Sequence, residues 1–496
     1  MRDTSLVDSV ISFRIVVVFT VLFAFVTGCA TRTSSRSHTV LPESVAAALK
    51  AAQLPESALS VIVRPVGGGM DALRQDAERL SAPASVMKLP TTLAALELLG
   101  PAFRPSVQLW TSASQAGERL QGDIVLRGLG NVEFDFAQLE ALLGKLRAKG
   151  VRVIEGDLIV DRSYFSPARM DIEVSPFDES PEFRYNIIPD AMMVNQNLVT
   201  LHLSANEKEV RALVAPLLPN VSVMSELTLN AARCADWEDS WQIPSVSVSA
   251  SGQSTITLRG AFPKNCARST EINVLDRNLM IASAFRAGWT ERVGGEWRGG
   301  LRTGTLVESA ARKLAEQFGR PVNALVREVN KSSDNALSRT MYLQFGVGHA
   351  RAGETSAQAS ERQLRAWLQR IGINDTGIGF ENGSGLSRTE RISALQLAQL
   401  LEYAHSKSPW SHEFIASLPV AGLDGTLRSR LTDSNAKHKA RLKTGTLRDV
   451  VSVAGYVPDA NGKLYIVVAI INHPRASHSV ARPVADALVD WVANMK

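Results

Sequence analysis

The spacing of hydrophobic and polar positions changes twice along the chain. From Ser85 to Leu99 the apolar side chains recur with helical spacing, which predicts a helix. Between residues 121 and 300, runs rich in β-branched residues predict strands at 123–127, 157–160, 199–203, 245–248 and 255–258, with one clear helix at 136–149. Helical spacing then returns at 306–318, 321–345 and 360–371. Strands at 450–457 and 464–471 and a last helix at 480–495 complete the pattern.

This order of elements predicts a mixed α/β (α+β) fold, in which one domain is split in the sequence by a β-rich insertion. The chain has 496 residues, of which 45% are hydrophobic and 21% charged. That composition is typical of globular proteins, and at about 150 residues per domain the length predicts about three domains.

Charge and metal-ligand patterns remove several function classes. The formal net charge is +5, and the basic residues are spread along the chain, so we do not expect nucleic-acid binding. The three cysteines have no metal-site spacing, and the eight histidines form no HExxH pattern. We therefore expect neither a metal site nor a cofactor.

The N-terminus has the features of an export signal. Arg2 and Arg14 precede an apolar run of 12 residues, Ile15–Val26, which is too short to span a membrane core of about 30 Å. The run ends in Val-Thr-Gly-Cys29, which resembles the lipobox of bacterial lipoproteins. We expect a signal peptide at 1–28, a lipid on Cys29 that attaches the protein to the membrane, and a flexible tether at 29–44. A plain secretory signal or a short membrane anchor is the alternative.

Export changes the interpretation of the remaining thiols. Ala30 follows the cysteine and no Asp stands there, which resembles lipoproteins sorted to the outer membrane, so we expect a periplasmic protein anchored to that membrane. Disulfides persist in that oxidising compartment. Cys234 and Cys266 could therefore form a disulfide, with two buried free thiols as the alternative.

Ser85 and Lys88 form the first candidate catalytic pair. Side chains three positions apart share one face of a helix, so the Lys88 amine can reach the Ser85 hydroxyl. A neutral amine can take the proton of a serine and make it nucleophilic. Lysine is neutral near pH 7 only if burial or another cation lowers its pKa, so we expect a closed cleft with a second positive charge.

Two further motifs complete the pattern. Ser333-Asp334-Asn335 offers a second hydroxyl and an amide, and Lys443-Thr444-Gly445-Thr446 offers positive charge, hydroxyls and close backbone approach. A second Ser-x-x-Lys pattern occurs at 434–437, which we interpret as a solvated loop. A stretch similar to Lys443–Thr446 occurs at 302–305, which we interpret as a turn into the helix at 306–318.

The chain thus contains three motifs in this order: Ser-x-x-Lys at 85, Ser-Asp-Asn at 333 and Lys-Thr-Gly at 443. These motifs and their order resemble those of class A β-lactamases and penicillin-binding proteins. Residues 45–496 resemble more closely the class C low-molecular-mass penicillin-binding proteins, the penicillin-binding protein 4 type of D-alanyl-D-alanine carboxypeptidase/endopeptidase. The stretches that carry this likeness are Pro83–Lys88, Thr91–Gly100, Gly122–Gly128, Asn382–Arg388 and Gly422–Leu427. Asn382 departs from the family, which usually has Asp there, and Gly130-Asn131 replaces a common Gly-Asp-Pro.

The resemblance implies a transpeptidase-type catalytic domain, like that of β-lactamases, with an insertion of two nested domains. We expect the catalytic domain at 45–104 and 301–496. The first inserted domain is expected at 105–169 and 263–300, and the nested one at 170–262.

The resemblance also implies acyl transfer from peptidoglycan peptides that end in D-Ala-D-Ala. Ser85 would attack the penultimate D-Ala carbonyl and Lys88 would accept its proton. Ser333 would relay that proton to the leaving amine, and Asn335 would orient Lys88 and the substrate. β-Lactam antibiotics should acylate Ser85 in the same way.

The motif at Lys443–Thr446 has the remaining implied roles. Lys443 would keep Lys88 neutral and, with Thr444 and Thr446, hold the terminal carboxylate. The N–H groups of Ser85 and Thr446 would form the oxyanion hole. Two alternatives stay open: a β-lactamase, and a catalytically idle scaffold lipoprotein that binds the cell wall.

Overall fold

The computed structural model describes residues 40–496. The expected signal peptide and Cys29 lie outside these residues, as does most of the expected tether. Helix α1 (Glu43–Ala51) begins just inside the range expected for the tether. Within residues 40–496, no helix is both long and apolar enough to cross a membrane.

A central antiparallel sheet joins the two ends of the described chain. Its strand order is β19-β20-β21-β1-β2, so the early strands pair directly with the late hairpin. The bounds are β1 (Leu59–Pro65), β2 (Leu73–Gln75), β19 (Arg441–Leu447), β20 (Val450–Pro458) and β21 (Leu464–Asn472). The predicted hairpin is confirmed, and β19 forms one edge of the sheet.

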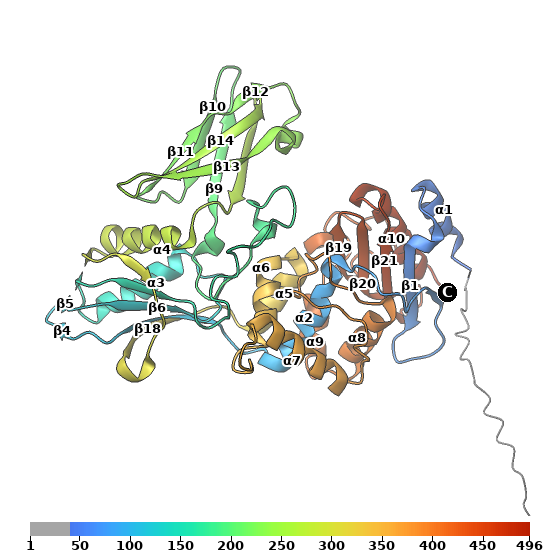
Figure 1. The fold of residues 1–496 in the computed structure, drawn as a ribbon. Helices are drawn as coiled ribbons and strands as arrows, with labels where there is room; N and C mark the ends of the chain where they lie inside the picture. The colour runs from blue at the N-terminus through green and yellow to red at the C-terminus, as the bar shows by residue number, and fades with distance from the viewer. Residues whose placement is uncertain (1–39) are drawn as a thin grey trace, which may run out of the picture. The chain divides into compact units, whose positions relative to one another are not determined.

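Helices cover both faces of this sheet, because successive strand residues point to opposite sides. On β21, Val467 packs in a cluster with α1 and α10 (His478–Ala493), whereas Val468 packs in a second cluster with the other helices (Figure 1). Those helices are α2 (Lys88–Ala94), α5 (Val322–Ser332), α6 (Asn335–Gln344), α7 (Ser356–Arg370), α8 (Ala394–Ser406) and α9 (Ser411–Ser417).

The β-rich part begins with a five-stranded and a four-stranded sheet. The first has the order β17-β8-β6-β3-β18 and the second β16-β7-β5-β4. Helices α3 (Phe136–Ala148) and α4 (Arg277–Arg286) accompany them, and α4 was not predicted. The strands are β3 (Ser106–Thr111), β4 (Gln115–Ala116), β5 (Arg119–Leu120), β6 (Ile124–Gly128), β7 (Val153–Ile154), β8 (Leu158–Asp161), β16 (Glu296–Trp297), β17 (Leu301–Thr303) and β18 (Arg312–Phe318).

The nested part contains two smaller sheets (Figure 1). One has the order β10-β9-β15, and in the other β11, β12 and β13 all pair with β14. The strands are β9 (Val199–Ala205), β10 (Val210–Ala215), β11 (Val221–Ser225), β12 (Thr228–Asn230), β13 (Trp241–Val248), β14 (Ser254–Pro263) and β15 (Ala267–Ile272). They contain the strands predicted at 199–203, 245–248 and 255–258.

The helix predicted at 306–318 is wrong. Residues 312–318 form strand β18, which pairs antiparallel with β3, and residues 301–303 form β17, which pairs with β8. Leu, Ala, Glu and Gln favour helix in isolation, but pairing with an available strand outweighs that preference. Residues 301–318, which we assigned to the catalytic domain, therefore share a sheet with the first inserted part. The other domain boundaries stay predictions.

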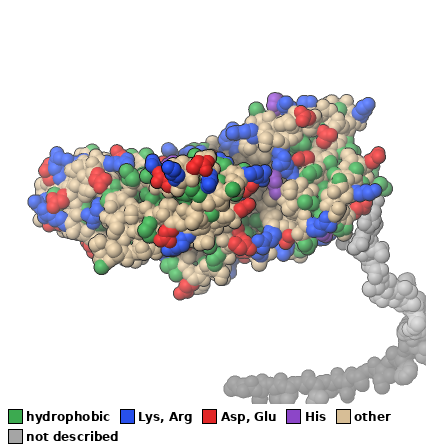
Figure 2. Space-filling view, turned by 90° about the horizontal axis from the view of Figure 1, so that it is seen from above, with side chains coloured by type: hydrophobic (Ala, Val, Ile, Leu, Met, Phe, Trp, Pro, Cys, Tyr) green, Lys and Arg blue, Asp and Glu red, His purple; other side chains and the backbone are tan. Residues whose placement is uncertain are grey.

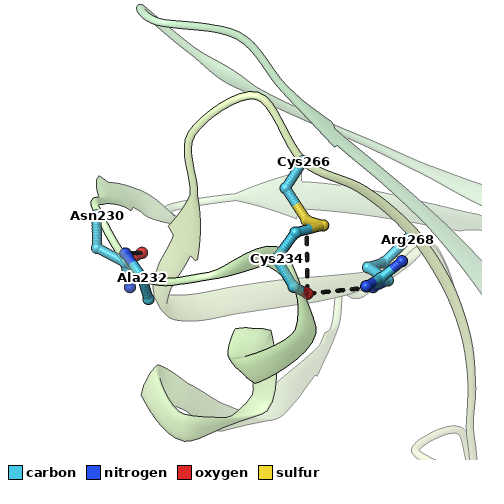
Figure 3. Close-up of a disulfide and its surroundings, with 5 residues drawn as sticks. All are labelled: Asn230, Ala232, Cys234, Cys266 and Arg268. Atoms are coloured by element: carbon cyan, nitrogen blue, oxygen red, sulfur yellow. Dashed lines mark hydrogen bonds between the residues drawn. A yellow bond between two sulfur atoms is a disulfide. The ribbon is translucent and has the colours of Figure 1, made fainter.

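The predicted disulfide is present (Figure 3). Cys234 and Cys266 are bonded, with their Cα atoms 5.3 Å apart. The Cys234 carbonyl also accepts a hydrogen bond from Arg268 Nε at 3.2 Å. The bridge connects the short 3₁₀ segment Cys234–Ser240 to the start of β15.

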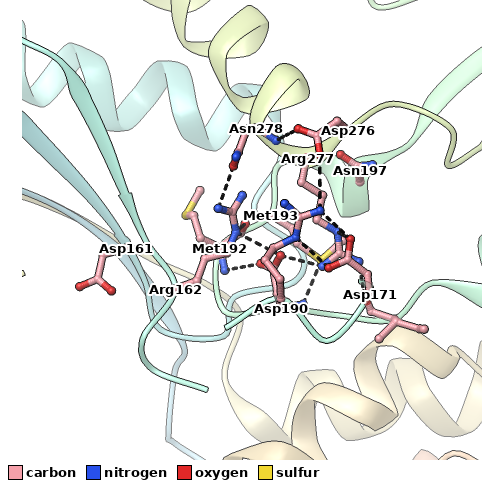
Figure 4. A network of polar contacts seen from close by, with 12 residues as sticks. Asp161, Arg162, Asp171, Asp190, Met192, Met193, Asn197, Asp276, Arg277 and Asn278 are labelled. Atoms are coloured by element: carbon pink, nitrogen blue, oxygen red, sulfur yellow. Dashed lines mark hydrogen bonds and ion pairs between the residues drawn. The ribbon is translucent and has the colours of Figure 1, made fainter. Parts of the chain in front are cut away.

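A buried ion-pair cluster links the start and end of the nested part (Figure 4). Asp190 is 1% exposed and pairs with Arg162 Nε at 3.1 Å and Arg277 Nη1 at 2.6 Å. Arg162 also donates to Asn278 Oδ1 on α4 at 2.9 Å. Burying charges is costly unless they are paired, so this cluster keeps the segments that enter and leave the nested part in one arrangement.

Charged side chains of both signs are mixed on the face shown in Figure 2. Lys and Arg alternate there with Asp and Glu rather than gathering on one surface. A single-sign field of the kind that attracts nucleic acid is not visible on this face.

Candidate active site

Ser85 lies in a tight turn that leads into α2. The turn is a 3₁₀ segment, Ala84–Met87, so the helix predicted from Ser85 becomes α-helical only at Lys88. Ala84 has φ +49°, a left-handed conformation that costs energy for a residue with a Cβ. On the sheet side, Ser452 Oγ of β20 donates to the Pro83 carbonyl at 2.6 Å and anchors the turn.

Lys88 is completely buried and faces three oxygen atoms. Its Nζ lies 2.9 Å from Ser85 Oγ and 2.7 Å from Asn335 Oδ1, and it donates to the Ser384 carbonyl. A neutral amine has two N–H groups and one lone pair. The Asn335 and Ser384 oxygens can accept both hydrogens, which leaves the lone pair directed at the Ser85 hydroxyl.

The electrostatic setting favours the neutral form of Lys88. Burial and the nearby charge of Lys443 lower the pKa of Lys88 well below its ordinary value, against smaller opposing effects of Asp334 and Glu390. Burial also lowers the pKa of Lys443, to about 7. Lys443 is the second cationic group near Lys88, and its positive form lowers the pKa of Lys88.

Ser333 interrupts what we predicted as one helix at 321–345. Helix α5 ends at Ser332, and Ser333 adopts the left-handed conformation with φ +64°. Asp334 then caps α6 by accepting a hydrogen bond from the Leu337 N–H at 2.8 Å. This break turns the Ser333 hydroxyl toward Lys443, whose Nζ donates to it at 2.8 Å.

Lys443 and Gly445 lie on the edge strand β19, which passes beside the serine. A Cβ added to Gly445 would lie 2.8 Å from the Ser85 main-chain nitrogen. Only glycine allows this approach without displacing one of the two segments. The absence of a side chain at this position therefore allows the strand backbone to lie next to Ser85.

The two threonines of the strand motif make different contacts. Thr446 lines the cleft with Ser85, whereas the Thr444 hydroxyl donates to Thr426 Oγ1 at 2.8 Å. The turn that carries Thr426 is fixed by Lys331, whose Nζ donates to Asp424 Oδ1 at 2.8 Å. Thr444 therefore does not line the cleft, and its hydroxyl is engaged by Thr426 in this arrangement.

Four of the candidate residues, Ser85, Ser333, Asn335 and Thr446, line a cleft of about 370 Å³. The other lining residues come from the inserted part and from nearby loops, and include Phe177, Glu179, Tyr185, Arg388 and Arg448. Arg448 pairs with Glu179 at 2.9 Å, and the Arg388 guanidinium stacks over Phe177 at 4.4 Å.

Sequence reasoning missed two main-chain oxygens of the site. The Ser384 carbonyl accepts from Lys88, and the Tyr185 carbonyl accepts from Asn335 Nδ2 at 2.8 Å. A carbonyl carries no residue signature, although Ser384 lies within the 382–388 stretch that contributed to the family resemblance.

The two stretches that are similar to the site motifs, 302–305 and 434–437, do not line the cleft. Residues 302 and 303 belong to β17, so the predicted turn at 302–305 is wrong. Residues 434–437 form a turn in which Ser434 Oγ donates to Asp490. In the part of the chain from residue 40 onward, no cluster of three His, Cys, Asp or Glu side chains could hold a metal ion.

This chain is similar to known D-Ala-D-Ala carboxypeptidases. The model of the D-Ala-D-Ala carboxypeptidase 3 (S13) family matches residues 41–495. A D-alanyl-D-alanine carboxypeptidase of Actinomadura sp. strain R39 is 28% identical over 90% of this chain and 83% of its own length. D-alanyl-D-alanine carboxypeptidase DacB of Haemophilus influenzae is 24% identical over 78% of this chain and 80% of its own.

The fold is also similar to solved structures. The crystal structure of penicillin-binding protein 4 from Haemophilus influenzae has a TM-score of 0.76 at 22% identity, and covers 91% of this chain and 99% of its own. A second structure of that protein, in complex with a β-lactam, has a TM-score of 0.73 at 21% identity and the same coverage. The family match spans nearly all of the described residues. The chain belongs to the D-Ala-D-Ala carboxypeptidase 3 (S13) family.

Proposed function

We propose that this protein is a serine D-Ala-D-Ala carboxypeptidase that works through an acyl-enzyme on Ser85. Family membership gives the enzyme class, and peptidoglycan stem peptides are the substrate this class implies. The observation that carries the proposal is the contact of the buried Lys88 amine with Ser85, at 2.9 Å. That amine is held by two oxygen acceptors, Asn335 Oδ1 and the Ser384 carbonyl.

The reaction begins with proton transfer from the Ser85 hydroxyl to the Lys88 lone pair. Ser85 Oγ forms a bond to the carbonyl carbon of the penultimate D-Ala, and the bond to the terminal D-Ala nitrogen breaks. Ser333, next to Lys443, relays the proton from Lys88 to the departing amine, which leaves Lys88 neutral again. Water then attacks the ester carbonyl, its oxygen stays on the acyl group and one of its protons returns to Ser85 Oγ, which restores the free serine.

Electrostatics support each step. The N–H groups of Ser85 and Thr446 are proposed to bind the developing oxyanion, and such a donor contributes about 3–4 kcal/mol in other enzymes. Lys443 and Thr446 are proposed to hold the terminal carboxylate, whereas the Thr444 hydroxyl is bonded to Thr426. The charge of Lys443 also keeps Lys88 neutral.

β-Lactams should follow the same route, because their ring amide presents an acyl carbon to Ser85 and the leaving amine stays tethered. A long-lived adduct is expected, since the chain matches a carboxypeptidase family rather than a β-lactamase. The idle-scaffold alternative conflicts with the intact Ser85–Lys88 contact. Activity on cross-linked peptides remains a prediction.

From the sequence we propose export by residues 1–28, lipid attachment at Cys29 and a periplasmic site at the outer membrane. The disulfide between Cys234 and Cys266 supports an oxidising compartment, because cytosolic proteins seldom keep such bonds.

The test is D-Ala release from a pentapeptide that ends in D-Ala-D-Ala. The protein should release D-Ala, and Ser85→Ala should not, although it folds normally. Equal release by Ser85→Ala would contradict the assignment of the nucleophile. Ser434→Ala changes the serine of the second Ser-x-x-Lys pattern, which lies outside the cleft. This variant is the matched control and should behave like the parent.

A further inference from the structure

A buried carboxylate that the proposed mechanism does not use lies close to Lys88. Glu390 is 1% exposed, and its carboxylate accepts hydrogen bonds from four main-chain N–H groups. The donors are Glu381 (3.2 Å), Asn382 (3.0 Å) and Gly383 (2.8 Å) to Oε1, and Gly385 (2.8 Å) to Oε2. One side chain thus fixes the turn at residues 381–386.

The contact with Gly385 connects Glu390 to the catalytic lysine. The Gly385 N–H and the Ser384 carbonyl belong to the same peptide group. Glu390 Oε2 accepts from that N–H, and the carbonyl accepts from Lys88 Nζ. Because a peptide group is planar and rigid, the carboxylate and the amine hold its two ends.

The turn is also pressed against the nucleophile. Gly383 and Gly385 have φ +69° and +82°, which a residue with a Cβ rarely adopts. A Cβ on Gly385 would overlap the carbonyl of Ala84, the residue before Ser85. Any shift of the turn therefore moves both an acceptor of Lys88 and the backbone at Ser85.

We propose that Glu390 is a positioning residue for the general base. Through the Ser384–Gly385 peptide group it orients and polarises the carbonyl that holds Lys88 Nζ beside Ser85 Oγ. This inference rests on the proposed function, in which Lys88 takes the proton of Ser85. Hydrogen-bonded groups polarise one another in a low dielectric, so the carboxylate also strengthens this acceptor.

The positioning role of Glu390 predicts a change in the pH dependence of the acylation rate. Acylation requires neutral Lys88, so its rate falls at low pH as Lys88 becomes protonated. Glu390 opposes the lowering of the Lys88 pKa, because its negative charge stabilises the ammonium form. Removing that charge should move the acid limb of the profile to lower pH.

The experiment compares Glu390→Gln with Glu381→Gln. Glutamine keeps the shape of Glu390 but directs an N–H₂ donor at the Gly385 N–H. Glu381 is an exposed carboxylate in the same turn, and its contacts are with side chains, chiefly the hydroxyls of Ser387 and Thr389. The readout is the second-order rate of acylation by benzylpenicillin between pH 4 and pH 9.

We expect Glu390→Gln to acylate about 10- to 100-fold more slowly, with its acid limb at lower pH, because small misplacements of catalytic groups have effects of that size. Glu381→Gln should match the parent. An unchanged rate, or a slower rate with an unmoved acid limb, would overturn the positioning role. A parent that is not acylated at all would instead contradict the proposed function.

A second measurement needs no variant, in case Glu390→Gln does not fold. Hydrogen–deuterium exchange of the parent protein should show slow exchange at residues 381, 382, 383 and 385, because their N–H groups are bonded to Glu390. Exchange at the rate of an exposed loop would overturn the inference even if acylation proceeds normally.

Discussion

The side-chain amide of Asn335 donates to the main-chain carbonyl of Tyr185 at 2.8 Å. Asn335 belongs to the catalytic triplets, whereas Tyr185 belongs to the segment between β8 and β9. The other end of the same amide accepts from Lys88 at 2.7 Å. The inserted part therefore helps to orient the amide that holds the catalytic lysine.

Asp334→Ala should weaken both stability and acylation. Asp334 caps α6, which begins at Asn335, and losing such a cap costs about 1 kcal/mol. Asp334→Asn should restore most of the stability, because Asn is an equally good cap. Urea unfolding and the benzylpenicillin acylation rate are the measurements.

Arg184→Ala is the control for Asp334. Arg184 pairs with Asp334 at 3.2 Å and Glu271 at 3.0 Å, but it is half exposed, and such pairs contribute about 0–1 kcal/mol. Acylation should stay within about two-fold of the parent for so small an effect. A larger loss in Arg184→Ala than in Asp334→Ala would contradict the capping account.

The acylation rate should be bell-shaped in pH. Lys88 must be neutral to act as base, so the rate rises as pH increases through the lowered pKa of Lys88. Lys443 must be charged to hold a carboxylate, and burial lowers the pKa of Lys443 to about 7. The rate should therefore fall as pH rises above about 7, and a rate still increasing at pH 9 would contradict this role.

Gly445→Ala should block acylation. Its Cβ would lie 2.8 Å from the Ser85 nitrogen, so strand β19 or the serine turn must move. We expect at least about a 100-fold slower reaction with benzylpenicillin. Gly144→Ala is the matched control, because Gly144 lies in helix α3 with open space around it. It should keep full activity and gain about 0.5–1 kcal/mol of stability.

Removing the disulfide should destabilise the nested sheets without affecting the catalytic site. For the 32-residue separation of Cys234 and Cys266, the chain-entropy model gives about 3–4 kcal/mol. Trp237 and Trp241 lie next to the bridge, 5.4 Å apart between ring centroids, so their fluorescence reports local unfolding. The Cys234→Ser, Cys266→Ser double variant should unfold there at lower urea and still react with benzylpenicillin. Unchanged local unfolding would contradict the prediction.

The sequence was sufficient for the chemistry-bearing side chains but not for the backbone around them. Ser85, Lys88, Ser333, Asn335 and Lys443 were recognisable because hydroxyl, amine and amide groups stand in characteristic triplets. The left-handed residue at Ser333, which divides a predicted helix, has no comparable signal. Main-chain acceptors such as Ser384 are defined only by the fold.

The error at residues 306–318 has a different origin. Local preference favours a helix there, but β18 completes a sheet with β3, a strand about 200 residues earlier in the chain. Long-range pairing of this kind cannot be deduced from spacing alone. The role proposed for Glu390 could not be deduced from the sequence either, because it depends on a turn that encloses the Glu390 carboxylate.

The most direct test of the central claim is the intact mass of the protein after incubation with benzylpenicillin, beside Ser85→Ala and Lys88→Ala. The account predicts one stable adduct on the parent, located on Ser85 by peptide mapping, and none on either folded variant. An adduct on Ser85→Ala would show that another residue is the nucleophile, and rapid acylation of Lys88→Ala would show that another base serves Ser85.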